Sequence, residues 1–426
     1  MLIRRGERYR IYPTPAQIER LTAWDNALRW LWNNAHAERM AKLEATYIQP
    51  TAYGQINDLT AIRASTSWIR DVPRDVCAHL IVELDKAWQL GLLKIAKMPW
   101  FKSKSRGDRP AITESNSKSF RVEGDGRDGV VVFPKLGRIP AVIHRPVNGK
   151  AKTCAIVRDG DQWFACISCE REIADPLPST KPAVALDVGV AKLIADSNGN
   201  IVENPRYAEK LQPQIRRTQR TVARRQKGSK NQHKARAKVA RLQRKVRRQR
   251  EHTLHVASHH YAKNHGVVIV EALKIQNMTR SARGTVESPG VNVAAKRGLN
   301  RAIGNAGWGR FREMLKYKVV PEGGRVIEVP PACSSQTCAE CGVVDAASRR
   351  SQASFVCTAC GHADNADVNA ARVLLARGLE KIAVETTVTV CGGTAAREHP
   401  VKQKLRVARR GTRLTDKAKA ESVGAG

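Results

Sequence analysis

The chain has 426 residues, 42% of them hydrophobic, and its 74 Lys and Arg against 39 Asp and Glu give a formal net charge of +35. This length and apolar content predict a globular protein of several domains and exclude a fibrous or wholly disordered chain. The charge predicts a polyanionic partner. It leaves a nucleic-acid enzyme and a simple nucleic-acid-binding protein both open.

The first 172 residues pass from a helical pattern to a strand-like one. Residues 8–12 alternate like a strand, and Thr14, Pro15 and Gln17 then supply an N-cap, a first-turn proline and a capping box, which predict the start of a helix. Apolar residues at helical spacing continue to about residue 97. From about 118 to 172, short β-type runs between turn residues predict a small β-barrel or sheet, into which the helices are inserted after the first strand.

Two later β-type runs each end in an acidic residue. Residues 182–187 end at Asp187, and residues 266–271 end at Glu271; Asp367 stands just before another helical stretch. Acids at strand ends meet at one edge of an α/β sheet, where they can bind hard divalent ions. One such acid alone is more simply a loop cap. Three in so basic a chain predict a metal site.

A strongly basic segment separates the two acid-ending runs. Residues 210–250 hold 17 Lys and Arg, no acidic residue and many helix formers, which predicts a long basic helical pair. On a merely solvated surface these charges would repel one another, whereas phosphates would neutralise them. We therefore expect this segment to bind a nucleic-acid backbone, with candidate contacts at Arg216, Arg217, Arg224, Arg225, Lys227 and Lys230.

Four cysteines are spaced as in a zinc ribbon. Cys338 and Cys341 form one Cys-x2-Cys pair, and Cys357 and Cys360 form a second pair after 15 residues. In an intracellular protein, thiols this close predict one bound Zn²⁺ and not disulfides. Cys333 lies five residues before the first pair and fits neither.

These motifs, in this order along nearly the whole chain, resemble the TnpB family of transposon-encoded RNA-guided DNA endonucleases, which are relatives of the miniature type V CRISPR effectors. The resemblance is carried by residues 186–189, 270–278, 307–311 with 317–318, 335–342, 355–361 and 367–371.

The resemblance implies a multidomain α/β fold. An RNase H-like (RuvC-type) nuclease domain with an inserted zinc ribbon would stand beside an N-terminal β-barrel wedge, which carries a helical recognition insertion. The expected boundaries are residues 1–13 and 106–180 for the wedge, 14–105 for the recognition domain, 181–332 and 362–383 for the nuclease domain, 333–361 for the ribbon, and 384–426 for a basic, disordered tail.

The resemblance also implies a function: RNA-guided cleavage of target DNA next to a short adjacent motif, with guide RNA and DNA as partners. Asp187, Glu271 and Asp367 would be the catalytic ligands of Mg²⁺ or Mn²⁺, and Arg349 or Arg350 would lie near the scissile phosphate. The adjacent motif would be read by Tyr53, Asn57 and Arg74.

The third acid departs from the family pattern. Many members carry Asp-Arg-Asp where this chain has Asn365-Ala366-Asp367, so Asp364 stays open as a second candidate.

Three other functions also stay open: a miniature type V CRISPR effector, a guided DNA-binding repressor that does not cleave, and a zinc-ribbon RNA-binding module. A repressor would be expected to lack the acids, and an RNA-binding module would leave them unexplained. No apolar stretch has the roughly 18 residues of a membrane span, and Met1–Arg10 does not resemble a secretory signal. We therefore expect no membrane partner and a location in the prokaryotic cytoplasm, associated with the nucleoid when bound to DNA. We also expect a monomer.

Overall fold

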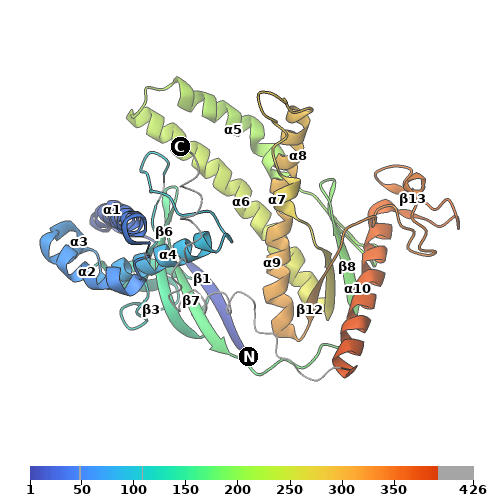
Figure 1. Ribbon diagram of the computed structural model, residues 1–426, viewed down its shortest axis with the longest axis horizontal. Coiled ribbons are helices and arrows are strands. Elements are labelled where there is room, and N and C mark those ends of the chain that lie inside the picture. The colour runs from blue at the N-terminus through green and yellow to red at the C-terminus, as the bar shows by residue number, and fades with distance from the viewer. Residues whose placement is uncertain (48, 108, 392–426) are drawn as a thin grey trace, which may run out of the picture. The chain divides into compact units, whose positions relative to one another are not determined.

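The computed structural model of the chain describes residues 1–47, 49–107 and 109–391. These residues form two compact units, divided between Ile173 and Ala174 (Figure 1). In this described part of the chain, no helix combines the length and the apolar character that crossing a membrane requires.

The first unit is built on a seven-stranded antiparallel sheet with the strand order β2-β6-β7-β1-β5-β4-β3. The strands are β1 (Leu2–Ile11), β2 (Ile112–Glu114), β3 (Arg121–Glu123), β4 (Gly126–Phe133), β5 (Gly137–Ile143), β6 (Lys150–Asp159) and β7 (Gln162–Glu172). β1 pairs with β7 along its whole length, so the two ends of this unit's sequence meet in the middle of the sheet.

Four helices lie between β1 and β2 in the chain: α1 (Pro15–Thr46), α2 (Ala52–Ser65), α3 (Ser67–Asp71) and α4 (Arg74–Leu92). The predicted start of α1 is confirmed, because the Thr14 side chain accepts a hydrogen bond from the Gln17 backbone and the Gln17 side chain accepts one from the Thr14 backbone. Trp24 of α1 and Trp88 of α4 are buried with Tyr9 of β1 in one core, so the helices pack on the sheet.

The β-barrel or sheet expected here is present as a sheet, which the hydrogen bonds among the described residues do not close into a barrel. Among the residues that can be placed, β2 and β3 remain its two edges. Each is only three residues long. The apolar face of the sheet is covered by α1 and α4 and does not need to curl onto itself to be buried.

The second unit contains a five-stranded mixed sheet with the order β10-β9-β8-β11-β12. The strands are β8 (Ala183–Val188), β9 (Lys192–Asp196), β10 (Ile201–Glu203), β11 (Val267–Glu271) and β12 (Arg325–Val329). β9 runs antiparallel to both β8 and β10, whereas β8, β11 and β12 run parallel. β8 and β11 each bury three apolar residues directly before their acid, which confirms the two predicted buried strands.

Helices cover both faces of this mixed sheet. They are α5 (Tyr207–Arg224), α6 (Lys230–Asn264), α7 (Ile275–Met278), α8 (Val293–Ala306), α9 (Trp308–Val319) and α10 (Ala366–Cys391), with a 3-10 turn η1 (Val320–Glu322). Tyr261 of α6 and Phe311 of α9 join the core on one face. Leu374 of α10 packs with Ile269 and Ile327 on the other. The helical pair predicted for the basic segment is confirmed as α5 and α6.

A small ribbon lies in the chain between β12 and α10. It contains the 3-10 turn η2 (Ala346–Ser348) and the antiparallel strands β13 (Ser354–Val356) and β14 (Ala363–Asn365). Phe355 is buried against Cys338 and Cys357, so the ribbon has only a minimal apolar core.

α10 extends to Cys391, past the expected start of a disordered tail at residue 384. No Gly or Pro interrupts the sequence from residue 379 to 391, and the first helix breakers are Gly392 and Gly393. The rest of the expected tail lies outside the described residues.

Candidate active site

Asp187, Glu271 and Asp367 line one pocket of the second unit. Asp187 lies near the end of β8 and Glu271 at the end of β11. Because these strands are parallel neighbours, both acids reach the same sheet edge. Asp367 joins them from the first turn of α10. The structure thus brings together the three acids selected from the sequence, and each is half-buried.

Two of these acids, Asp187 and Glu271, have raised pKa values. Burial raises the pKa of Asp187 to about 7, with the nearby charges of Glu271 and Asp367 contributing to the rise and Arg349 opposing it. Burial also raises the pKa of Glu271, against a hydrogen bond from Ser334. Oxygen ligands that are costly to ionise together suit a hard divalent cation, whose charge removes that cost. The donor set therefore fits Mg²⁺ or Mn²⁺, although these carboxylates lie more widely spaced than the four cysteine sulfurs described below.

Arg349 is the arginine that lines this pocket. Its Nη2 lies 3.3 Å from Oδ1 of Asp367. Asp364, the alternative third acid, instead places Oδ2 3.0 Å from Nη1 of Arg372. Neither Asp364 nor Arg350 is found among the described residues that line the pocket. The geometry thus favours Asp367 over Asp364 and Arg349 over Arg350.

Sequence reasoning missed Ser334. Its side chain is almost fully buried, and its Oγ lies 3.2 Å from Oε1 of Glu271. The sequence signal was its place four residues before the first zinc-ribbon cysteine, but no local pattern links it to an acid more than sixty residues earlier.

The four ribbon cysteines come together as predicted. Sγ of Cys338 lies 3.7 Å from Sγ of Cys360, Sγ of Cys341 lies 3.6 Å from Sγ of Cys357, and all four sulfurs lie within 4.8 Å of one another. A tetrahedron with Zn–S bonds of about 2.3 Å has edges of about 3.8 Å, so the cluster has the size of a zinc site. Among the described Asp, Glu, His and Cys residues, no other group of three or more is as tightly gathered.

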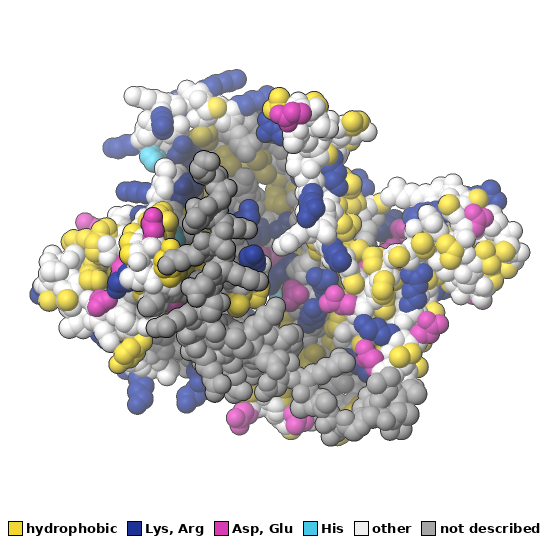
Figure 2. Space-filling model, viewed as in Figure 1, with side chains coloured by type: hydrophobic (Ala, Val, Ile, Leu, Met, Phe, Trp, Pro, Cys, Tyr) yellow, Lys and Arg dark blue, Asp and Glu magenta, His cyan; other side chains and the backbone are white. Residues whose placement is uncertain are grey.

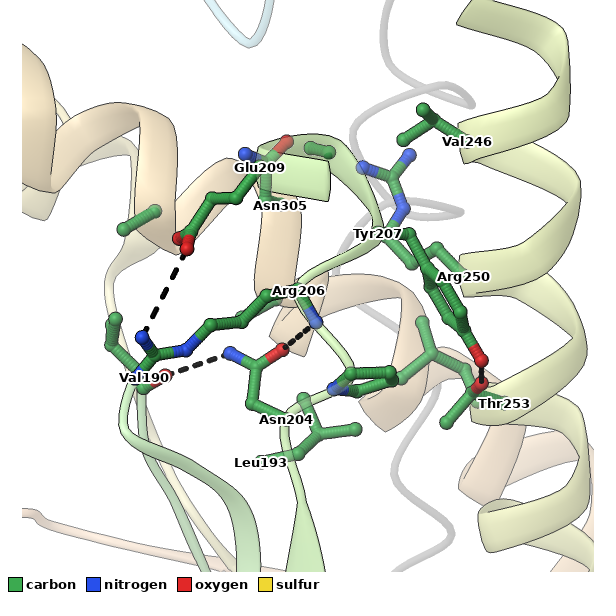
Figure 3. A pocket seen from close by; sticks show the side chains of 15 residues that line it. Val190, Leu193, Asn204, Arg206, Tyr207, Glu209, Val246, Arg250, Thr253 and Asn305 are labelled. Carbon is green, nitrogen blue, oxygen red and sulfur yellow. Dashed lines mark hydrogen bonds and ion pairs between the residues drawn. The ribbon is translucent and has the colours of Figure 1, made fainter. Parts of the chain in front are cut away.

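The basic helical pair, α5 and α6, borders a pocket that adjoins the acid pocket. All six predicted contacts on and around α5 are exposed, and Lys and Arg side chains project from this pair at the top of Figure 2. Just before the start of α5, Nδ2 of Asn204 donates to the Val190 carbonyl at 2.7 Å. Tyr207, the first residue of α5, places its OH 3.1 Å from Oγ1 of Thr253 of α6 (Figure 3). Val190 lines both the pocket in Figure 3 and the acid pocket, which makes the two neighbours.

The three residues expected to read the adjacent motif lie in the first unit. Tyr53 (75% exposed) and Asn57 lie on α2, and Arg74 begins α4. All three are exposed, and their role stays a prediction.

Three family models match this chain. They are the OrfB_IS605 "Helix-turn-helix domain" at residues 1–46, the OrfB_IS605 "Probable transposase" at residues 165–282, and the "Cas12f1-like, TNB domain" at residues 308–374. The "Putative RNA-guided DNA endonuclease InsQ" of Escherichia coli (strain K12) is 33% identical over 401 residues, covering 93% of this chain and 96% of that protein. This chain belongs to the TnpB family.

Other relatives agree with the TnpB assignment. A "Putative RNA-guided DNA endonuclease" of Streptomyces pristinaespiralis is 28% identical and covers 88% of this chain and 90% of its own. A 76-residue stretch is 41% identical to the "CRISPR-associated endodeoxyribonuclease Cas12f1" of Sulfoacidibacillus thermotolerans, over 18% of each chain.

A solved structure shows the shared fold. The protein in "Cryo-EM structure of the Cas12f1-sgRNA-target DNA complex" matches with a TM-score of 0.53 at 12% identity, over 88% of this chain and 98% of that one. The two units of this chain, with their sheets and helices, agree with the predicted multidomain α/β organisation. The segment matched by the helix-turn-helix model forms β1 and the single long helix α1 in this TnpB chain.

We predict about one zinc per chain, and we expect Cys338→Ser or Cys360→Ser to remove most of it, because a ribbon with so small a core depends on its ion. Metal analysis by mass spectrometry of the purified variants measures this. Cys333→Ser is the matched control and should keep its zinc, since Cys333 is exposed and outside the cluster. Zinc loss in the control would mean that the ligand set is wrong.

Proposed function

We propose that this TnpB chain is an RNA-guided, Mg²⁺-dependent DNA endonuclease associated with a transposable element. The observation that carries the proposal is the meeting of Asp187, Glu271 and Asp367 in one pocket of a chain of this family. The names of the Escherichia coli and Streptomyces relatives, both of which describe RNA-guided DNA endonucleases, support it.

The nuclease domain is proposed to be RNase H-like, of the RuvC type, and to comprise residues 181–332 and 362–383. A mixed five-stranded sheet with helices on both faces and acids at the ends of two neighbouring parallel strands, β8 and β11, supports this assignment. Residues 333–361 would be the zinc ribbon, 1–13 and 106–180 the wedge, and 14–105 the recognition domain.

Bound to the three carboxylates, two Mg²⁺ or Mn²⁺ ions would supply an activated water and charge stabilisation for the departing 3′ oxygen. The residues around the pocket have separate tasks. Arg349 can hold a phosphate oxygen of the DNA while its contact with Asp367 keeps the guanidinium in place. Asp187, whose pKa is raised in the metal-free protein, must lose its proton to serve as a ligand, so we expect the affinity for Mg²⁺ or Mn²⁺ to fall as the pH drops below about 7.

The guide RNA and the DNA are assigned to other surfaces. The exposed basic residues of α5 and the turn that follows would neutralise phosphates of the guide or of its heteroduplex. Base pairing would then supply sequence specificity, and the protein would read heteroduplex shape and a short adjacent motif, the latter through Tyr53, Asn57 and Arg74. The protein would act as a monomer.

The other functions are less favoured. A guided repressor without cleavage has no use for three acids in one pocket, and an RNA-binding module leaves them unexplained. The sequence match to a miniature CRISPR effector covers 18% of this chain, whereas the sequence match to the Escherichia coli relative covers 93% of it.

The proposed function is tested by purifying the protein from cells that carry its native locus. We expect a discrete RNA at about one copy per chain, and Mg²⁺-dependent cutting of a plasmid library that carries the matching target beside randomised flanks, with a single short motif enriched among the cut molecules. Protein stripped of RNA that cut the library equally well and equally selectively would contradict the guided mechanism.

A further inference from the structure

The segment 330–339 connects β12 to the first cysteine pair of the ribbon. Several hydrogen bonds fix its backbone conformation. Cys333 adopts a left-handed backbone conformation with a φ of 56°, which is uncommon for a residue other than Gly. Its carbonyl accepts hydrogen bonds from the backbone N–H groups of Gln336 and Thr337, both at 3.0 Å. Such a turn persists only when its surroundings hold it.

Asn369 of α10, which is fully buried, stabilises this segment by hydrogen bonds. Its Nδ2 donates to the Thr337 carbonyl at 2.8 Å, and its Oδ1 accepts from the Ala339 backbone N–H at 3.0 Å. Thr337 and Ala339 are the chain neighbours of Cys338, so the Asn369 side chain binds the backbone on both sides of the first zinc ligand. Asn369 stands two residues after Asp367 on the same helix, which ties the position of that acid to the cysteine.

A second bond leads from the same segment to the other acid. Ser334 Oγ lies 3.2 Å from Oε1 of Glu271 and 3.1 Å from the Pro331 carbonyl. A hydroxyl has one proton to donate, and an ionised carboxylate is the stronger acceptor. Arg377 of α10 fastens the start of the segment by donating to the Ala332 carbonyl at 2.7 Å.

We propose that Asn369 and Ser334 are positioning residues, through which the folded zinc ribbon sets the placement of Asp367 and Glu271 for binding the catalytic metal. The inference rests on the proposed function in taking these acids as metal ligands. The folded ribbon would then help to hold the two catalytic acids in place, in addition to any contact it makes with nucleic acid. Buried partners that orient metal ligands commonly change metal affinity by about 10- to 100-fold when removed.

The first experiment measures Mn²⁺ binding to full-length protein by electron paramagnetic resonance, without DNA, in wild type and Asn369→Ala. The variant leaves the Thr337 carbonyl and the Ala339 N–H without their partner. We expect about 10-fold weaker Mn²⁺ binding and about 10-fold faster zinc release to a chelator. Removing zinc from the wild type should weaken Mn²⁺ binding to a similar extent. Unchanged Mn²⁺ affinity in the variant or in the zinc-free protein would overturn the proposal.

The second experiment uses a smaller change, which removes a single hydroxyl group. Ser334→Ala should weaken Mn²⁺ binding by about 10-fold and leave zinc release unchanged, and Ser334→Thr, which keeps the hydroxyl, should restore the affinity. Asn300→Ala is the control for Asn369→Ala, because the Nδ2 of Asn300 donates to the Thr279 and Arg280 carbonyls, which do not line the acid pocket. Equal weakening in Asn300→Ala, or no rescue by Thr, would show a merely structural effect.

These measurements separate the inference from the proposed function. If Mn²⁺ binding depends on Asp187, Asn369 and Ser334 but guided cleavage is not found, the proposed function fails and the coupling stands. If guided cleavage is found and Mn²⁺ binding ignores Asn369 and Ser334, the coupling fails alone.

Discussion

Replacing Asp187 or Glu271 with Ala is expected to lower the rate of target cleavage by about 1,000-fold or more, because each change removes a ligand from a site that works only with its metals. Binding of guide RNA and target should stay within about twofold, since the acids do not belong to the basic pair. Single-turnover cleavage and filter binding on the same preparations measure the two effects. A variant that cuts at the wild-type rate would refute the assignment.

Measuring the free energy of unfolding shows whether loss of activity in an Asp187 variant comes from unfolding. The pKa of Asp187 is raised to about 7 in the folded, metal-free protein, so ionising this group opposes folding above that pH. Asp187→Asn should therefore stabilise the metal-free protein, on the order of 2 kcal/mol at pH 8, and this gain should shrink as the pH falls from 7 toward 4. An inactive variant that is more stable than the wild type at pH 8 cannot owe its inactivity to unfolding.

Asp364 and Asp367 form a matched pair for the third acid. Asp367→Ala should be as inactive as Asp187→Ala, whereas Asp364→Ala should keep cleavage within about fivefold of wild type, because Asp364 pairs with Arg372 and not with the pocket. The reverse result would move the third ligand to Asp364.

The second large effect concerns the guide. Changing Arg216, Arg217, Arg224, Arg225, Lys227 and Lys230 together to Gln should weaken guide RNA binding by about 100-fold or more near physiological salt. If all six contact phosphates of single-stranded RNA, the slope of log affinity against log salt should fall by about 4. Titrations at several salt concentrations give both values.

The control variant loses the same number of positive charges, at six positions in the first unit and not in the basic pair. Six basic residues with acidic partners in the first unit are changed to Gln: Arg4, Lys42, Lys86, Arg121, Arg138 and Lys152. Because their charges are compensated locally, we expect affinity and salt slope to change much less. Equal losses from both sets would mean that net charge, and not the basic pair, holds the RNA.

The sequence predicted those parts of the fold and site that depend on short patterns. The capping box at Thr14, the buried strands before Asp187 and Glu271, and the two cysteine pairs each need only neighbouring residues to be recognised. The choice of Asp367 over Asp364 could not be predicted in this way. It depends on which side chain faces the sheet edge when α10 packs, and both acids stand within one short stretch.

The remaining differences also arise from tertiary contacts. The first sheet stays open because α1 and α4 bury its apolar face, which no strand pattern reveals. Ser334 and Asn369 act across 63 and about 30 residues of sequence, and an isolated Ser or Asn has no periodicity to mark it. Residues 384–391 belong to α10, a helix that packs on the second sheet through its earlier residue Leu374.

The central claim, that this TnpB chain cuts where its RNA directs, is tested most directly by exchanging the guide. Protein loaded with its native RNA, in which only the terminal guide segment is replaced, is given two plasmids that share the adjacent motif and differ in the target sequence. We predict that the cut moves to the plasmid that matches the new guide, and that Asp187→Ala abolishes it there. Cutting that stays on the original plasmid, or falls equally on both, would contradict the account.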